Sequence, residues 1–140
     1  MARFFLVLAS TLLLDGSVCW ADDPPSTDIF GEWVVMEMIF KGVVQGVQPD
    51  HDYIKFDKDG MSLSSGGGER RFGFPYKCTS RPGAAELDIT LPDKTDLKAK
   101  YELKGDILRI IWHQGGGDRP THFDAVADKQ LTLRVLKRVK

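Results

Sequence analysis

One stretch decides the fold: Tyr-Glu-Leu-Lys-Gly-Asp-Ile-Leu-Arg-Ile-Ile-Trp, residues 101–112. It consists of two runs of alternating side chains joined by Gly105-Asp106. Glycine accepts a positive φ without a Cβ clash and aspartate tolerates one, so these two residues can form a tight turn whose twist matches that of its strands. The stretch therefore predicts a β-hairpin. Its inward residues are expected to be Ala99, Tyr101 and Leu103, then Leu108, Ile110 and Trp112.

The same pattern repeats on both sides of this hairpin. Further short strands are predicted at residues 31–40, 53–56, 61–64, 69–78, 85–91 and 121–126, and in a last strand with Leu131, Leu133 and Val135 facing inward. Helix is scarce, and only residues 43–50 are expected to form a loop or a short helical turn. About eight short strands with brief turns indicate an all-β fold, a small antiparallel up-and-down barrel of the lipocalin-like kind, because closure removes exposed sheet edges. A β-sandwich is the competing architecture.

Two positions interrupt the regular alternation. Residues 31–40 carry apolar side chains on both faces, so either both faces are partly covered or a β-bulge exchanges them. Pro75 cannot donate to a strand ladder, which predicts a sheet edge or a bulge within residues 69–78.

The N-terminus has the features of an export signal. Met1-Ala2-Arg3 precedes an apolar run, residues 4–14, that is too short to cross a bilayer. We expect a signal peptide at residues 1–21, cleaved after Ala21, and hence a secreted or periplasmic protein with no transmembrane segment in the mature chain. The acidic, proline-rich residues 22–29 predict an extended leader, and residues 30–140 are long enough for one domain.

Charge and cysteine content narrow the possible classes. The formal net charge of −1 gives no general attraction to nucleic acid, so no nucleic-acid partner is expected. Removal of the signal peptide takes Cys19 away and leaves Cys78, which we expect to be a buried thiol that packs as a small apolar side chain. The apolar core, and not a disulfide, must then stabilise the domain.

Four segments, in order along nearly all of the mature chain, resemble the small secreted lipocalin-like domain family abundant in planctomycete bacteria, a family of unassigned function. They are Gly31-Glu32-Trp33 and residues 101–108, 118–123 and 133–138. A more distant resemblance is to the lipocalins, in which a Gly-x-Trp on the first strand packs beneath an arginine from the last. This resemblance implies that Trp33 closes one end of the barrel together with Arg134 or Arg138. A cation over the indole face stabilises by about 1 kcal/mol beyond area burial.

No catalytic or metal-binding set can be assembled from these residues. Residues 60–64 approach a nucleophile elbow but carry Ser64 where its second glycine belongs, and residues 57–60 predict a plain turn in place of a calcium loop. The three histidines lack the spacing of metal ligands. We therefore expect a protein that is not an enzyme, with no metal and no cofactor; an unrecognised hydrolase is the alternative.

Two functions remain, and both depend on the barrel interior. The first is a secreted, non-enzymatic module that holds a small hydrophobic ligand among Phe56, Phe74, Tyr101 and Trp112. Arg119 either forms a salt bridge with Asp118 or Glu102, or lies at the barrel mouth and recognises an anionic group. A barrel of about eight strands is only just wide enough for one ligand or for its own side chains. The alternative is therefore a structural or protein-interaction module with a filled core, whose loops 65–70 and 113–119 bind a protein of the cell envelope.

Overall fold

The structure is a computed structural model that describes residues 28–48, 50–65, 72–81 and 84–140. The predicted signal peptide and most of the predicted leader lie outside these residues. The described residues form ten β-strands and no helix, so they hold no helix able to span a membrane. The strands are β1 (Gly31–Phe40), β2 (Val43–Gln45), β3 (Asp52–Asp57), β4 (Gly60–Ser65), β5 (Phe72–Phe74), β6 (Tyr76–Arg81), β7 (Ala84–Thr90), β8 (Asp96–Lys104), β9 (Ile107–His113) and β10 (Leu131–Arg138).

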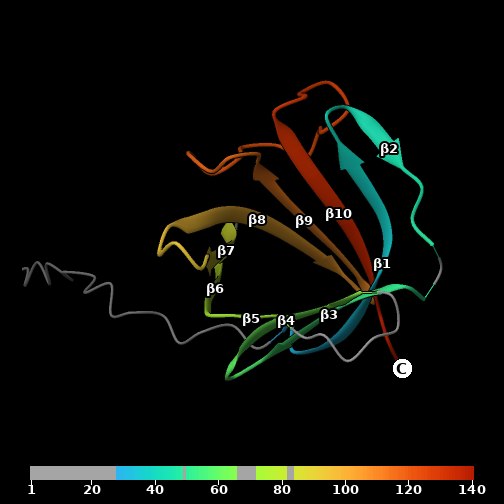
Figure 1. Cartoon of the computed structure of the whole chain (residues 1–140), viewed down its shortest axis with the longest axis vertical. Helices are drawn as coiled ribbons and strands as arrows, with labels where there is room; N and C mark the ends of the chain where they lie inside the picture. The colour runs from blue at the N-terminus through green and yellow to red at the C-terminus, as the bar shows by residue number, and fades with distance from the viewer. Residues whose placement is uncertain (1–27, 49, 66–71, 82–83) are drawn as a thin grey trace, which may run out of the picture.

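The strands pair antiparallel in one sheet that is nearly closed into a barrel. Their order is β5-β4-β3-β1-β10-β9-β8-β7-β6, and β2 pairs with β1 beside this path. Figure 1 shows β8, β9, β10 and β1 running side by side, with β3 and β4 crossing beneath them. The outermost strands of the path, β5 and β6, follow each other directly in the chain. The predicted all-β, up-and-down barrel is confirmed, with nine strands on the path where about eight were expected.

Pro75 lies between the two strands at the ends of the barrel path. It separates β5, which pairs with β4, from β6, which pairs with β7. The carbonyl oxygen of Pro75 accepts a hydrogen bond from the backbone N–H of Thr90 at 2.8 Å. The Tyr76 hydroxyl, on β6, donates to the carbonyl oxygen of Asp57, the last residue of β3, at 2.9 Å. Residues 69–78, predicted as one strand, therefore divide at Pro75 into two strands with different partners. These two strands are the edges of the sheet, and an edge is one of the two alternatives predicted for Pro75.

The hairpin of β8 and β9 forms as its turn residues predict. Lys104 pairs with Ile107, which leaves Gly105-Asp106 as a two-residue turn. Gly105 has φ of 59°, while Asp106 is not among the positive-φ residues, an arrangement typical of a type II′ turn. All six residues expected to face inward belong to the main core or pack against it.

A β-bulge in β1 resolves the alternative left open for that strand. The register with β10 shifts between Val35 and Glu37. Before the bulge, Trp33 and Val35 point into the main core; after it, Ile39 packs in a second apolar cluster. The bulge therefore lets one strand supply apolar side chains to both faces of the sheet.

The second cluster lies on the outer face of the sheet, and it corrects two predictions. Leu131 and Leu133 pack there with Ile111 and Ala125, and Val135 packs against them, so the prediction that the three residues of the last strand face into the barrel is wrong. They are buried because the long connection between β9 and β10 covers them. This connection contains turns and no strand at residues 121–126, contrary to the prediction.

Residues 43–50 also differ from the prediction, because they begin with a strand. β2 pairs with β1 through a two-residue turn in which Lys41 and Gly42 have φ of 52° and 77°. Both values are positive, as a type I′ hairpin turn requires. The turn of the β1–β2 hairpin lies close to the β9–β10 connection, since a Cβ at Gly42 would stand 3.1 Å from Lys129 and from the carbonyl oxygen of Val126. Figure 1 shows β2 beside the end of β1.

Candidate functional site

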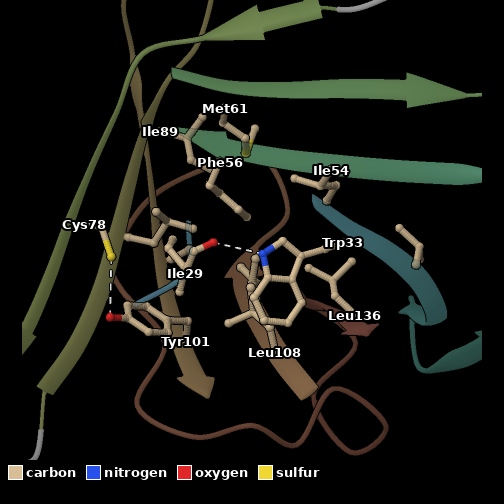
Figure 2. Close-up of a cluster of buried hydrophobic side chains, with 14 residues drawn as sticks. Ile29, Trp33, Ile54, Phe56, Met61, Cys78, Ile89, Tyr101, Leu108 and Leu136 are labelled. Carbon is tan, nitrogen blue, oxygen red and sulfur yellow. Dashed lines mark hydrogen bonds between the residues drawn. The ribbon is translucent and has the colours of Figure 1, made fainter. Parts of the chain in front are cut away.

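One end of the barrel is filled by a cluster around Trp33. The indole is fully buried, and its N–H donates to the carbonyl oxygen of Ile29 at 2.9 Å. Figure 2 shows Leu108 and Leu136 beside the ring, with Phe56 above Ile29. Ile29, which we expected in the extended leader, is itself fully buried in this core. Side chains of the described residues therefore fill this end of the barrel.

Arg138 covers the same tryptophan. Its guanidinium carbon lies 4.2 Å from the centre of the Trp33 ring. Its Nη1 donates to the carbonyl oxygen of Phe30 at 2.7 Å, and its Nη2 donates to that of Asp28 at 3.0 Å. Of the two arginines considered for this contact, Arg138 makes it and Arg134 lies elsewhere.

The other part of the barrel interior contains a cavity of about 170 Å³ that is open to solvent on one side. Side chains from β3, β4, β5, β7, β8, β9 and β10 line it, and nearly all of them are apolar. Its lining includes Ile54, Leu63, Phe74, Leu97, Trp112 and Arg134. The barrel is thus solid around Trp33 and hollow around Trp112.

The four aromatic residues proposed as a ligand-binding interior divide between these two regions. Phe74 and Trp112 line the cavity. Phe56 and Tyr101 are buried in the filled core, where Phe56 packs edge-on against Tyr76. The Tyr101 hydroxyl accepts a hydrogen bond from the buried Cys78 thiol at 3.4 Å (Figure 2). Of the four proposed aromatic residues, Phe74 and Trp112 are therefore the two that can contact a ligand in the cavity.

Arg119 lies outside the barrel, which differs from its proposed place at the barrel mouth. Its Nη2 forms a salt bridge with Asp88 at 2.7 Å, its Nε lies 3.6 Å from Glu86, and its Nη1 donates to the carbonyl oxygen of Ala99. Both carboxylates alternate with inward-facing leucine and isoleucine on β7, so they point to the outer face of the sheet. Arg119 fixes the β9–β10 connection to that face through partners other than those expected.

Arg134 is the functional candidate that the sequence analysis did not place in the interior. It pairs in register with Met38 and Ile110, and Ile110 points into the main core. Its guanidinium lies 5.4 Å from the Trp112 ring, and its Nε is buried without a hydrogen-bond partner. Burial lowers the pKa of this guanidinium, and the charge of Asp52 opposes that shift. Strand alternation carries the sequence signal for this placement: Arg134 lies two positions before the inward-facing Leu136 and therefore shares its face.

Neither a protein-family model, nor a curated protein, nor a solved structure matches this chain.

Arg134 also borders a second cavity of about 180 Å³, which shares Ile54 and Leu63 with the first. Asp52 lines this second cavity and already has partners: its carboxylate accepts from the Ser65 hydroxyl at 2.7 Å and lies 2.9 Å from His51 Nδ1. These contacts, led by the Ser65 hydrogen bond, lower the pKa of Asp52. The carboxylate is therefore negative at neutral pH.

Other candidates for chemistry do not come together in the described part of the chain. No group of three His, Cys, Asp or Glu side chains gathers there in a way that could hold a metal ion. His122 lies 3.9 Å from Asp128 on the connection between β9 and β10. Most of the proposed interaction loop 65–70 lies outside the described residues. Arg134 and the two cavities are accordingly the candidate site.

Proposed function

We propose that this chain is a secreted, non-enzymatic, lipocalin-like domain that binds a small hydrophobic ligand inside its barrel. The observation that carries the proposal is the apolar cavity of about 170 Å³ beside Trp112. Because this cavity is open to solvent on one side, its apolar lining is exposed to water, and a ligand that covers the lining gains the free energy of apolar burial.

The size of the cavity limits the ligand. An engineered apolar cavity of about 150 Å³ in another protein binds benzene, which gives a scale for the ligand. A benzene-sized ring or a short alkyl chain therefore fits beside Phe74 and Trp112, and the adjoining cavity can take a polar end. A long lipid tail does not fit, because the core around Trp33 fills the rest of the interior.

Nuclear magnetic resonance can test the proposal with 1-hexanol as the probe. Trp112 lines the cavity, whereas Trp33 lies in the filled core with its indole N–H bonded to Ile29. Titration should shift the indole N–H signal of Trp112 in a saturable way and leave that of Trp33 nearly unchanged. Equal shifts at both, or no saturable shift, would contradict the proposal.

A pair of matched variants locates the binding. Leu97→Phe adds a larger side chain to the cavity lining, and Ile107→Phe adds one at an exposed position of the neighbouring strand. We expect Leu97→Phe to weaken 1-hexanol binding by about tenfold, which corresponds to 1.4 kcal/mol, and Ile107→Phe to leave it unchanged. Similar affinity in both variants would place binding elsewhere.

A second candidate, a protein-interaction module of the cell envelope, is favoured by the β1–β2 hairpin. Phe40, Val43 and Val44 are 39%, 59% and 58% exposed on this hairpin. Phe40 and Val43 are cross-strand partners on one face, and Val44 is on the other. Exposed apolar patches are typical of protein-binding surfaces. Val43→Ser with Val44→Ser should abolish capture of a partner from an envelope fraction while leaving 1-hexanol binding intact. Capture that persists in this double variant would contradict the second candidate.

A further inference from the structure

We infer that Arg134 makes the barrel cavity a site for small monocarboxylates with an apolar tail, with the guanidinium binding the carboxylate. The inference rests on the proposed function, because it requires that the cavity holds a ligand. It adds the chemical class of that ligand and the residue that selects it.

The first reason is the position of the charge. Arg134 pairs with Met38 and Ile110, and its guanidinium stands over the face of the cavity-lining Trp112. Arg134 is partly buried, and its buried Nε loses hydration that no hydrogen bond within the described residues replaces. The cation–π contact with the Trp112 indole offsets part of this loss but supplies no hydrogen-bond acceptor for Nε. The placement is therefore costly for folding alone.

The second reason is that the chain leaves this charge incompletely paired. Arg134 Nε is buried with no hydrogen-bond partner, and no ion pair within 4.0 Å involves Arg134 in the part of the chain that the structure describes. Asp52, the carboxylate whose charge acts on it, is held by Ser65 and His51. Arg138 and Arg119, in contrast, use their nitrogens on carbonyl and carboxylate oxygens of this chain.

The third reason is the shape of the space around the guanidinium. Arg134 borders both cavities, with the apolar one on the side of Trp112 and the more polar one on the side of Ser64 and Ser65. An arginine fork binds a carboxylate through two parallel N–H···O bonds. An alkyl or phenyl tail in the apolar cavity brings its carboxylate to the guanidinium. The Asp52 charge disfavours a second negative group, so the ligand is a monoanion.

The test compares hexanoate with 1-hexanol, which have the same chain length and differ in head-group charge. Calorimetric titration at neutral pH should show that the wild-type protein binds hexanoate at least tenfold more tightly than 1-hexanol, since a hydrogen bond between two charged groups is stronger than one to a neutral hydroxyl. Arg134→Met should remove that preference, so that the variant binds hexanoate no more tightly than it binds 1-hexanol. Lys137→Gln removes one positive charge from an exposed position of the same strand and should keep the preference.

Folding of the variants supplies a second measurement. Arg134→Met replaces an unpaired buried nitrogen by an apolar chain of similar length, so its urea midpoint without ligand should equal or exceed that of the wild type. Arg134→Lys retains the charge and should retain part of the preference for hexanoate. A clearly lower midpoint in Arg134→Met would show that the chain already satisfies the guanidinium, which would overturn the inference.

The binding outcomes separate this inference from the proposed function. Equal affinities of the wild type for hexanoate and 1-hexanol would overturn the role of Arg134 and leave the apolar binding module standing. Binding of neither probe would overturn both. A preference for hexanoate that survives in Arg134→Met but disappears in Lys137→Gln would move carboxylate recognition to the surface and would likewise overturn the inference.

Discussion

Replacing Arg138 by methionine tests whether the end of the last strand anchors the closed end of the barrel. The Arg138 guanidinium contacts the buried Trp33 ring at 4.2 Å and donates to the carbonyl oxygens of Phe30 and Asp28. Methionine keeps most of the apolar stem but removes the charge and both hydrogen bonds. The variant therefore isolates the polar contribution of this side chain.

The expected loss follows from these contacts. Each hydrogen bond from a charged donor contributes about 1.5–3 kcal/mol, and a partly shielded cation over an indole contributes about 1 kcal/mol. The Arg138 side chain is 28% exposed, and contributions that share one group are not additive. We expect Arg138→Met to lower the free energy of unfolding by about 3 kcal/mol, a large share of the 5–15 kcal/mol typical of a domain.

Urea unfolding followed by circular dichroism measures the effect, with Arg109→Met as the control. Arg109 lies over the Phe123 ring at 4.9 Å and pairs with Glu102 at 2.8 Å, but it makes no hydrogen bond to a backbone carbonyl among the described residues. Its exposed ion pair should contribute less than about 1 kcal/mol. Equal losses in the two variants, or a loss below about 0.5 kcal/mol for Arg138→Met, would refute the anchoring role.

Three further changes test other parts of the fold. A Cβ at Gly60, where φ is +154°, would stand 2.9 Å from the carbonyl oxygen of Phe74. Gly60→Ala should therefore lower the free energy of unfolding, measured by thermal denaturation, by about 2 kcal/mol. Gly73→Ala is the control and should be nearly neutral, because nothing lies within 4 Å of a Cβ there. Burial raises the pKa of Tyr76 to about 12, above the pKa of a tyrosine in the unfolded chain. The neutral Tyr76 hydroxyl should therefore contribute its full stability below pH 10 and lose it as the pH rises towards 12. Urea midpoints measured across this pH range should decline in the wild type and decline less in Tyr76→Phe. Trp33→Phe removes a buried hydrogen bond and leaves a void, so its unfolding free energy should fall by about 2 kcal/mol; an unchanged value would contradict the role of the indole N–H.

Local chemistry made much of the fold predictable. The turn at Gly105-Asp106 and the break at Pro75 depend on the backbone freedom of glycine and on the missing N–H of proline, which act wherever those residues stand. The inward residues of β8 and β9 follow from alternation once the turn is fixed. Features set by a few neighbouring residues can thus be read from the sequence.

The facing of the last strand could not be predicted in this way, because it depends on a distant segment. Alternation in β10 separates Leu131 and Leu133 from Leu136, yet both sets are apolar, and alternation does not say which set faces inward. The connection carrying Phe123 and Ala125 covers the first set, and this tertiary contact leaves no periodic signal. A long polar connection between two strands should therefore be considered as a possible cover for the outer face of a barrel.

Three arginines of this chain show why a site residue is harder to recognise than a structural one. Arg138 and Arg119 donate to oxygens of the chain itself, so their roles are complete in the folded protein. Arg134 leaves its buried Nε without an acceptor beside an apolar cavity. The sequence gives all three the same side chain, and only the inventory of their hydrogen-bond partners separates them. An unpaired buried donor lowers stability, and a ligand that supplies the missing acceptor recovers it on binding, which is why Arg134 is assigned the ligand.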